Sequence, residues 1–386
     1  MVAALAAQAS SARVSDVFAP AQCHRLIVKI GSALLVDRSG HIRRDWLETV
    51  VADVAQRRMA GQQIAIVSSG AIALGARVLG LPKGGRASLE DAQAAAATGQ
   101  IGLSSAWAQL LHDRGLVAAQ MLVTLDDLED RRRYLNAAAT LDRLLALSVV
   151  PVINENDSVA TTEIRFGDND RLAARVGQAA AAAGVILLSD IDGLYTANPG
   201  VDPSAAFVPE VRIVDARIRA MADGGSASGM GSGGMFSKLE AARIAQGSGA
   251  HLAIVSGKVD HPLSRFAETG RGTLFWGGEG KRGRKAWLAG RLTSRGRITV
   301  DAGAIDALRK GRSLLAAGAT AVAGQFARGD VVEICDADGA ILARGLAEYD
   351  ATDAARIVGH RSDAHGELLG YAPRSAMIHR DHMVLV

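Results

Sequence analysis

The sequence has few cysteines, little net charge and no long apolar run. Only Cys23 and Cys335 occur among 386 residues, which excludes a disulfide framework and gives no cysteine-based zinc motif. The 43 Lys and Arg residues nearly balance 40 Asp and Glu residues, so neither a nucleic-acid coat nor a membrane-surface protein is indicated. Every apolar run ends well before the roughly 20 residues that a membrane span needs. We therefore expect a globular protein of the reducing cytoplasm, with no membrane partner.

The first 24 residues are rich in Ala and Ser and lack the basic start of a signal peptide. Their apolar piece, residues 2–7, is also shorter than the hydrophobic core of such a signal. We interpret residues 1–24 as an extension without function and expect it to be disordered.

From residue 25 the chain alternates short β-type runs with Ala-rich helical stretches. The predicted strands are residues 26–30, 63–67, 120–123, 149–153, 185–188 and 251–255, with helices between them, for example over residues 43–60, 88–112 and 131–147. This order is typical of a mainly parallel sheet covered by helices on both faces. We predict an α/β fold, a three-layer αβα sandwich, over residues 25–276.

After residue 276 the composition changes. Residues 277–297 hold seven Lys and Arg residues, several glycines and one acidic residue, Glu279, so we predict a basic linker over residues 277–293. Short strand-like runs at residues 297–300, 330–334 and 341–344 follow, separated by Gly and Asp turns. We expect a small β-rich domain and a C-terminal tail over residues 294–386.

Polar residues gather where four of the predicted strands end. They are Lys29, Gly31 and Ser32 at the first strand, Ser68, Ser69 and Gly70 at the second, Glu155 and Asp157 at the fourth, and Ser189, Asp190 and Asp192 at the fifth. Carboxyl ends of parallel strands share one edge of a sheet, where ligands bind in open α/β folds. Lys29 is costly to bury unless an anion faces it. Each group alone could be an edge lysine, an N-cap or a turn, but the four together indicate one binding site.

A glycine-rich segment, residues 224–238, ends in Lys238 and precedes a helical stretch predicted to begin near Leu239. Six glycines followed by a lysine are typical of a loop that wraps phosphates. The segment contains a GxGxxG pattern, but no good strand precedes it, and Met235 stands where a Walker A loop needs lysine. We predict that Lys238 binds phosphate in another architecture; a plain glycine linker is the alternative.

The acidic stretch over residues 149–170 first suggests a cation site, since Asp168, Asn169 and Asp170 could supply oxygen ligands. An EF-hand loop starting at Asp168 would need Gly at its sixth position, where this sequence has Ala173. We therefore predict no protein-held metal. From the residues alone, a solvated acidic loop remains the alternative.

The nine histidines are scattered, and only His379 and His382 lie close together in the sequence, so neither a histidine metal site nor a histidine base is indicated. A carboxylate substrate needs no base, because its reference pKa of about 4 leaves it ionised at neutral pH. Phosphorylating it requires instead that two anions be neutralised and aligned, a task for lysines and backbone N–H groups.

Six segments together resemble the amino acid kinase superfamily and, within it, the glutamate 5-kinases with a C-terminal PUA domain. They are VKIGS (28–32), VSSGAIALG (67–75), VVPVINEND (149–157), GDND (167–170), LLSDIDGLYT (187–196) and GMGSGGMFSK (229–238). NEND with GDND separates this family from aspartate, acetylglutamate and uridylate kinases. ITVDAGA (298–304) and GQFARGDVVEI (324–334) are similar to PUA sequences. Ser replaces the family's commoner Thr at five positions, which keeps each hydroxyl.

The resemblance implies ATP-dependent phosphorylation of the γ-carboxylate of L-glutamate to L-glutamyl 5-phosphate, the first step of proline biosynthesis. It also implies a role for each matching residue. Lys29, Lys238, Asp170, Gly31 and Gly70 would be catalytic, Ser69, Asp157 and Asn169 would bind glutamate, and Lys29, Ser189, Asp190, Ser232, Gly233, Gly234, Met235, Phe236, Ser237 and Lys238 would bind ATP. In this scheme Asp170 aims the two lysines, and Asp157 pairs with the α-ammonium group of glutamate.

The resemblance further implies Mg²⁺ carried on the phosphates of ATP, feedback inhibition by L-proline and a homo-oligomer, a dimer or tetramer. Two alternatives stay open. One is a kinase for another carboxylate, aspartate or N-acetylglutamate. The other is an RNA-binding PUA protein, because the linker is basic and PUA domains commonly serve RNA-modifying enzymes. The linker has Trp287 as its single aromatic residue, which counts against RNA.

Overall fold

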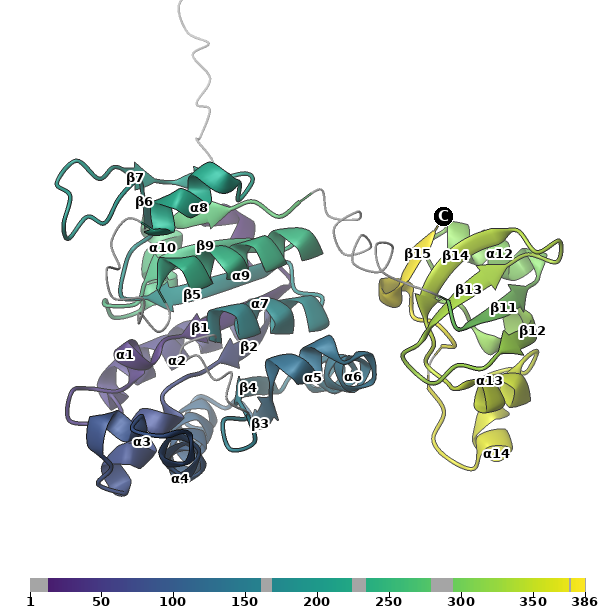
Figure 1. Ribbon diagram of the computed structural model, residues 1–386, viewed down its shortest axis with the longest axis horizontal. Helices are drawn as coiled ribbons and strands as arrows, with labels where there is room; N and C mark the ends of the chain where they lie inside the picture. Colours follow the sequence, from purple (N-terminus) through teal and green to yellow (C-terminus); the bar gives the residue numbers. More distant parts are fainter. Residues whose placement is uncertain (1–12, 161–168, 224–233, 279–293, 375, 386) are drawn as a thin grey trace, which may run out of the picture. The chain divides into compact units, whose positions relative to one another are not determined.

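The computed structural model describes residues 13–160, 169–223, 234–278, 294–374 and 376–385 (Figure 1). The chain forms two compact units. The first comprises residues up to 124, 143–246 and 250–276, and the second comprises residues 125–142, 247–249 and 277–386.

An eight-stranded sheet forms the centre of the first unit. Its strands are β1 (Arg25–Ile30), β2 (Gln63–Val67), β3 (Ala118–Val123), β4 (Val150–Glu155), β5 (Gly184–Ser189), β8 (Glu210–Val211), β9 (His251–Ser256) and β10 (Thr273–Phe275). They lie in the order β3-β4-β2-β1-β5-β9-β10-β8, and all neighbours are parallel except β9 and β10. A separate short pair joins β6 (Leu194–Tyr195) to β7 (Phe207–Val208). The predicted mainly parallel sheet is confirmed.

Helices cover both faces of this sheet. The helices of the first unit are α1 (Ser32–Leu35), α2 (Arg44–Met59), α3 (Ala71–Val78), α4 (Leu89–His112), α7 (Asn169–Ala179), α8 (Ala216–Asp223), α9 (Met235–Ser248) and α10 (Pro262–Thr269). Two further helices, α5 (Leu125–Glu129) and α6 (Arg131–Ala146), lie wholly or mostly in the residues of the second unit. Val28 and Ile30 of β1 share one core with residues of α2, α4 and α10. On the other face α7 packs closely, since a Cβ on Gly177 would lie 3.0 Å from Val185. The predicted three-layer αβα sandwich is confirmed.

The described part of the N-terminal extension, residues 13–24, packs onto the first unit. Phe18, at the end of a short 3₁₀ turn (Asp16–Phe18), is fully buried. Its carbonyl accepts hydrogen bonds from Arg57 and Gln62, both at 3.0 Å. The expectation of disorder was therefore wrong for residues 13–24, because Phe18 and Cys23 are buried in the core and Arg13 donates to the Glu268 carbonyl at 2.6 Å. Residues 1–12 lie outside the described part of the chain.

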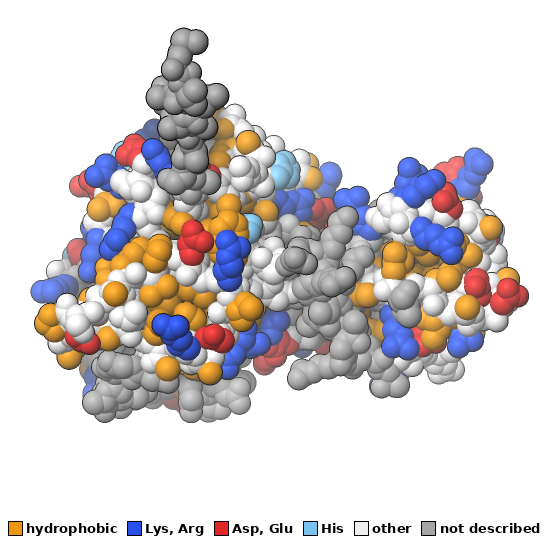
Figure 2. Space-filling model, turned by 90° about the horizontal axis from the view of Figure 1, so that it is seen from above, with side chains coloured by type: hydrophobic (Ala, Val, Ile, Leu, Met, Phe, Trp, Pro, Cys, Tyr) orange, Lys and Arg blue, Asp and Glu red, His pale blue; other side chains and the backbone are white. Residues whose placement is uncertain are grey.

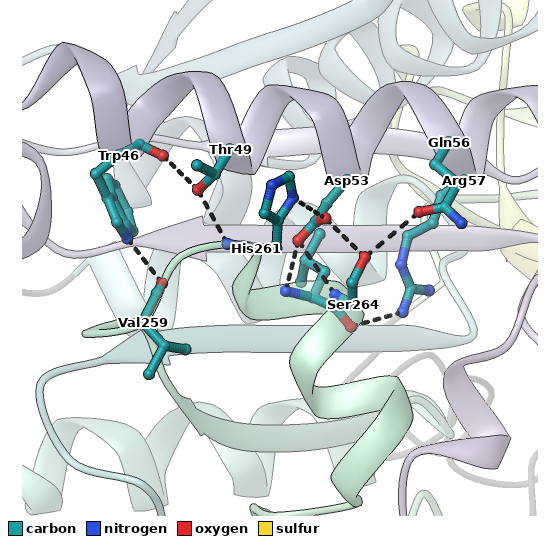
Figure 3. A network of polar contacts seen from close by, with 9 residues as sticks. Trp46, Thr49, Asp53, Gln56, Arg57, Val259, His261 and Ser264 are labelled. Atoms are coloured by element: carbon teal, nitrogen blue, oxygen red, sulfur yellow. Dashed lines mark hydrogen bonds and ion pairs between the residues drawn. The ribbon is translucent and has the colours of Figure 1, made fainter.

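Asp53 of α2 fixes the start of α10 (Figure 3). Its buried carboxylate accepts hydrogen bonds from the backbone N–H groups of Leu263 (2.9 Å) and Ser264 (3.1 Å) and from the Ser264 hydroxyl (2.7 Å). His261 Nδ1 also lies 3.0 Å from this carboxylate. A helix leaves its first N–H groups without partners inside the helix, and a carboxylate there satisfies them. The contact ties α2 to the segment that follows β9.

The second unit contains a five-stranded mixed sheet in the order β12-β11-β13-β14-β15. The strands are β11 (Gly296–Val300), β12 (Ala319–Gly324), β13 (Val331–Cys335), β14 (Ile341–Leu346) and β15 (Met383–Leu385), with helices α12 (Ala302–Arg309), α13 (Ala351–Ile357) and α14 (His365–Leu369). Its own core includes Ile298, Leu308, Ile334 and Ile357. The predicted small β-rich domain is confirmed. Most of the predicted basic linker, residues 279–293, lies outside the described residues.

Basic and acidic side chains are intermixed on the face of each unit seen in Figure 2, with apolar side chains between them. This agrees with the near balance of 43 basic and 40 acidic residues in the sequence. In the described parts of the chain, no helix combines the length and apolar character that crossing a membrane requires.

Candidate active site

Strands β4, β2, β1 and β5 are consecutive neighbours in the sheet, so their carboxyl ends meet at one edge. Lys29 of β1 pairs with Val67 of β2 on one side and with Leu187 of β5 on the other. Val67 in turn pairs with Ile153 of β4. The polar residues that follow these positions therefore lie side by side, as the sequence predicted.

Lys29, Asp170 and Lys238 form a buried cluster at this edge. The Nζ atom of Lys29 lies 2.6 Å from Oδ1 of Asp170, and Nζ of Lys238 lies 2.9 Å from Oδ2 of the same carboxylate. The three side chains come from β1, α7 and α9. Two ammonium groups around one carboxylate carry a net positive charge, and such a cluster attracts anions. The structure thus brings together the three charged residues that the sequence assigned to catalysis.

Burial and the neighbouring charges set the protonation of this cluster. Burial lowers the pKa of Lys29, while Asp170 opposes that shift, Lys238 adds to it and Asp190 weakly opposes it. Burial by itself would raise the pKa of Asp170, but the charges of Lys29 and Lys238 and their hydrogen bonds hold it below its ordinary range. Asp170 is therefore an ionised carboxylate, the state that can hold two cations.

Lys238 lies in the first turn of α9, which begins at Met235. The prediction of a helix beginning near Leu239 was wrong, because the glycine run ends at Gly234 and the residues after it are compatible with a helix. The Ser237 N–H donates to the Gly234 carbonyl at 3.1 Å, and Phe236 is 58% exposed. Two predicted nucleotide-binding residues, Ser232 and Gly233, lie outside the described residues, as does Asp168.

Two predicted catalytic glycines, Gly31 and Gly70, follow β1 and β2. Gly70 has a φ of 106°, in the left-handed region, and stands at the N-cap of α3. A Cβ there would also lie 3.1 Å from Val36, so other residues are disfavoured on both counts. A Cβ on Gly31 would lie 3.7 Å from Nζ of Lys29. The absence of that carbon keeps the space beside the ammonium group open.

Ser69 and Asn169 meet at the start of α7. The Asn169 amide nitrogen donates to Oγ of Ser69 at 2.6 Å, so the hydrogen of that hydroxyl can point to a ligand. Oδ1 of Asn169 is buried and has no hydrogen-bond partner among the residues that the structure describes. An unsatisfied buried acceptor fits a site that waits for a donor from a ligand.

Asp157 follows β4 and is half-buried. Burial raises the pKa of its carboxyl group to about 6, although the charge of Arg86 opposes the shift. A carboxyl group so poorly solvated gains from a bound cation. A cavity of about 460 Å³ borders Asp157 on the side of Gln100 and Gln120, and the two lysines do not line it.

At the end of β5, next to β1 in the sheet, Ser189 is buried and its hydroxyl donates to Oδ1 of Asp190 at 3.2 Å. The Ser189 carbonyl accepts from the N–H of Gly257, at 2.7 Å, which joins the ends of β5 and β9. Asp190 itself is exposed. The hydroxyl and the carboxylate are thus held together at the sheet edge.

Neither Asn154 nor Gln100 was predicted as a site residue from the sequence. Asn154 is almost fully buried, and its amide nitrogen donates to Oε1 of Gln100 at 2.7 Å, while its oxygen lies 3.4 Å from the Asn169 nitrogen. A polar residue near the end of an apolar strand was the available signal for Asn154. Nothing local marks Gln100, which lies in the middle of an Ala-rich helix.

The chain is similar to known proteins over nearly its whole length. The model of the amino acid kinase family matches residues 24–256, and that of the PUA domain matches residues 296–365. A glutamate 5-kinase of Sphingopyxis alaskensis is 69% identical over 96% of this chain and 100% of its own length. Glutamate 5-kinases of Zymomonas mobilis (61%, covering 96% of this chain and 93% of theirs) and Novosphingobium aromaticivorans (62%, 94% and 96%) are also similar. The chain therefore belongs to the amino acid kinase family and, within it, to the glutamate 5-kinases.

Proposed function

We propose that this chain transfers the γ-phosphoryl group of ATP to the γ-carboxylate of L-glutamate, giving L-glutamyl 5-phosphate and ADP, the first step of proline biosynthesis. The observation that carries the proposal is the buried Lys29, Asp170 and Lys238 cluster at the carboxyl edge of the sheet. It sits between residues proposed for glutamate, after β2 and β4, and residues proposed for the nucleotide, after β5.

The chemistry joins two anions. An oxygen of the γ-carboxylate forms a bond to the γ-phosphorus, and the bond from that phosphorus to the bridging oxygen of ADP breaks. Lys29 and Lys238 would offset the negative charge of both reactants, and the N–H groups of Gly31 and Gly70 would donate to the transferring group. No proton moves, because the substrate carboxylate is already ionised at neutral pH.

Glutamate would lie against Ser69, Asp157 and Asn169. The Asp157 carboxylate and the free acceptor of Asn169 suit the α-ammonium group, and the free hydrogen of the Ser69 hydroxyl suits a carboxylate. L-proline would act as a feedback inhibitor at or near this place, since it shares the α-carboxylate and a charged α-nitrogen with glutamate.

ATP would lie across Ser189, Asp190 and the N-terminal turn of α9, with Ser232 and Gly233 completing its phosphate contacts. Mg²⁺ would arrive with ATP and supply charge neutralisation on the phosphates. Among the described residues no group of three His, Cys, Asp or Glu side chains gathers, so phosphate oxygens would hold this ion.

We further propose that the catalytic domain covers residues 25–276 and that the PUA domain with a C-terminal tail covers residues 294–386. The enzyme would work in the cytoplasm and form a homo-oligomer. Measuring ADP release with ATP and each of L-glutamate, L-aspartate and N-acetyl-L-glutamate tests the reaction. We expect turnover with L-glutamate at least about 100-fold above the other two, because a misplaced reacting carboxylate loses alignment. Activity restricted to aspartate or N-acetylglutamate would contradict the proposal.

A further inference from the structure

Helix α4 carries three hydrogen-bonding side chains, Gln93, Gln100 and Trp107, each seven residues from the next. Their partners lie in β4 or in the segments after β2 and β4, beside the proposed glutamate site. Seven residues are close to two helical turns, so the three lie on one face. Nε2 of Gln93 donates to the Ala160 carbonyl at 3.0 Å, Oε1 of Gln100 accepts from Asn154 at 2.7 Å, and Nε1 of Trp107 donates to Oγ of Ser68 at 3.0 Å. One face of α4 therefore makes hydrogen bonds to the end of β4 and to the segments that follow β2 and β4.

The direction of the hydrogen bond between Gln100 and Asn154 is fixed by backbone groups. The N–H of Glu155 can only donate, and it lies 2.9 Å from Oδ1 of Asn154, so the Asn154 nitrogen must face Gln100. Gln100 then presents its oxygen to Asn154, and its nitrogen donates to Oγ of Ser104 at 3.1 Å. The Ser104 hydroxyl in turn donates to the Gln100 carbonyl at 2.7 Å. In this orientation the side-chain nitrogens of Asn154 and Gln100 donate to acceptors, and their side-chain oxygens accept from donors.

The amide of Asn169 is oriented in the same way. The carbonyl of Ser68 can only accept, and it lies 3.3 Å from Nδ2 of Asn169, which also approaches Oγ of Ser69 (2.6 Å) and Oδ1 of Asn154 (3.4 Å). The remaining atom, Oδ1 of Asn169, must be an acceptor. It is buried and lacks a partner within the described residues. A donor brought by a ligand would satisfy it.

We propose that Gln100 is a positioning residue for glutamate. It holds the buried Asn154 amide in place, Asn154 supports the Asn169 nitrogen, and the Asn169 oxygen stays turned toward the α-ammonium group of the substrate. Gln100 itself touches no substrate in this scheme. The inference rests on the proposed assignment of Asn169 to glutamate and adds a residue to that site.

The scheme separates the two substrates. The hydrogen bonds from Gln100 lead through Asn154 to Asn169 and Ser69, all on the β2 and β4 side of Lys29. The residues proposed for ATP follow β5, on the opposite side of β1. Loss of the Gln100 amide should therefore weaken the binding of glutamate and leave the binding of ATP unchanged.

Gln100→Met tests the proposal, because methionine keeps the length of the side chain and removes both hydrogen bonds. We expect the KM for L-glutamate to rise about tenfold, with kcat and the KM for ATP within about twofold. Gln109→Met is the matched control, since Gln109 is exposed on the same helix and, within the described residues, its side chain donates to Asp113 alone. In Gln100→Glu an oxygen can still accept from Asn154, and we expect the glutamate KM to return to within about threefold of wild type.

A second measurement compares L-glutamate with glutarate, which lacks the α-ammonium group. In Gln100→Met the preference for L-glutamate, as a ratio of kcat/KM values, should fall about tenfold, which a general loss of packing would not produce. Ser104→Ala removes the hydroxyl that accepts from the Gln100 nitrogen. This variant tests the role of Gln100 if Gln100→Met fails to fold. We expect a glutamate KM about threefold higher in that variant.

Asn169→Ala separates failure of this inference from failure of the site assignment. If Asn169→Ala raises the glutamate KM while Gln100→Met and Ser104→Ala leave it and the glutarate preference unchanged, the role of Gln100 is overturned and the site stands. If Asn169→Ala itself leaves the glutamate KM unchanged, the site assignment is wrong. Equal losses of affinity for glutamate and ATP in Gln100→Met would also overturn the inference.

Discussion

The ammonium nitrogen of Lys29 lies 2.6 Å from Oδ1 of Asp170, a carboxylate whose side chain has no exposed surface. The other oxygen of that carboxylate holds Lys238 at 2.9 Å. A free lysine side chain samples many rotamers, and fixing it costs up to about 2 kcal/mol of entropy. Asp170 holds both lysines in place in the folded protein, so this loss of entropy occurs during folding. It does not recur when the substrates react, and the electrostatic site is therefore preorganised.

Lys238→Ala should lower kcat far more than it changes the KM for glutamate. The Lys238 charge matters most where negative charge develops during transfer, so we expect a fall in kcat of about 100-fold or more and a glutamate KM within about threefold. Steady-state kinetics measure both constants. Arg243→Ala on the same helix is the control, since in the described part of the chain Arg243 pairs with Glu240 alone, one turn away. An unchanged kcat with a raised KM would contradict the catalytic role.

The affinity for glutamate should depend on the ionisation of Asp157. Its pKa is raised to about 6 by burial, so below that pH the carboxyl group is neutral and pairs poorly with an ammonium group. We expect kcat/KM for glutamate to rise about tenfold per pH unit up to about pH 6 and to level off above about pH 7. The γ-carboxylate of glutamate, with a reference pKa of about 4, contributes little to this change.

The matched variant is Asp157→Asn, in which the inflection near pH 6 should disappear together with much of the glutamate affinity. A profile of the same shape in both proteins would assign the inflection to another group. The stability of the fold should change with pH in the opposite direction to the affinity for glutamate. Because the folded pKa exceeds the ordinary value near 4, ionising Asp157 costs stability as the pH rises from about 4 to about 6.

Asp53→Ala should destabilise the first unit without altering catalysis. The variant leaves the N–H groups of Leu263 and Ser264 and the Ser264 hydroxyl without their buried acceptor. We expect the free energy of unfolding to fall by about 2–3 kcal/mol, measured by urea denaturation. Ser264→Ala, which removes only the hydroxyl, should cost about 1 kcal/mol. Equal stability of Asp53→Ala and wild type would show that the contact in Figure 3 does not hold α10.

Gly99 and Gly102 lie on the same helix and should respond oppositely to alanine. A Cβ on Gly99 would lie 1.9 Å from the carbonyl oxygen of Ala71, so α3 and α4 would have to separate. We expect Gly99→Ala to lower the free energy of unfolding by about 2 kcal/mol or more. A Cβ on Gly102 meets nothing within 4 Å, and the better helix propensity of alanine should stabilise by up to about 1 kcal/mol. Thermal unfolding of both variants checks the pair, and a neutral Gly99→Ala would refute the close packing.

The secondary structure of the first unit was predictable because its strands are short apolar runs and its helices are long and Ala-rich. The predicted strand over residues 63–67 has the observed bounds of β2, and Ser88, predicted as the first residue of a helix, is the N-cap of α4. Phe18 was misjudged because a single aromatic residue has no periodic neighbours, and the start of α9 because the preceding glycines concealed it.

The sequence alone determined the alternation of strands and helices, the residue types at each strand end, and the motifs that identify the family. These are local properties, set by side-chain periodicity and backbone propensity. The resemblance implied that Asp170 aims Lys29 and Lys238, 68 residues further on, but only the tertiary structure gave the contacts and their burial. It alone decided that Gln100 accepts a hydrogen bond from Asn154. Such contacts depend on the order of strands in the sheet and the packing of helices on it, which join residues that carry no local signal of each other.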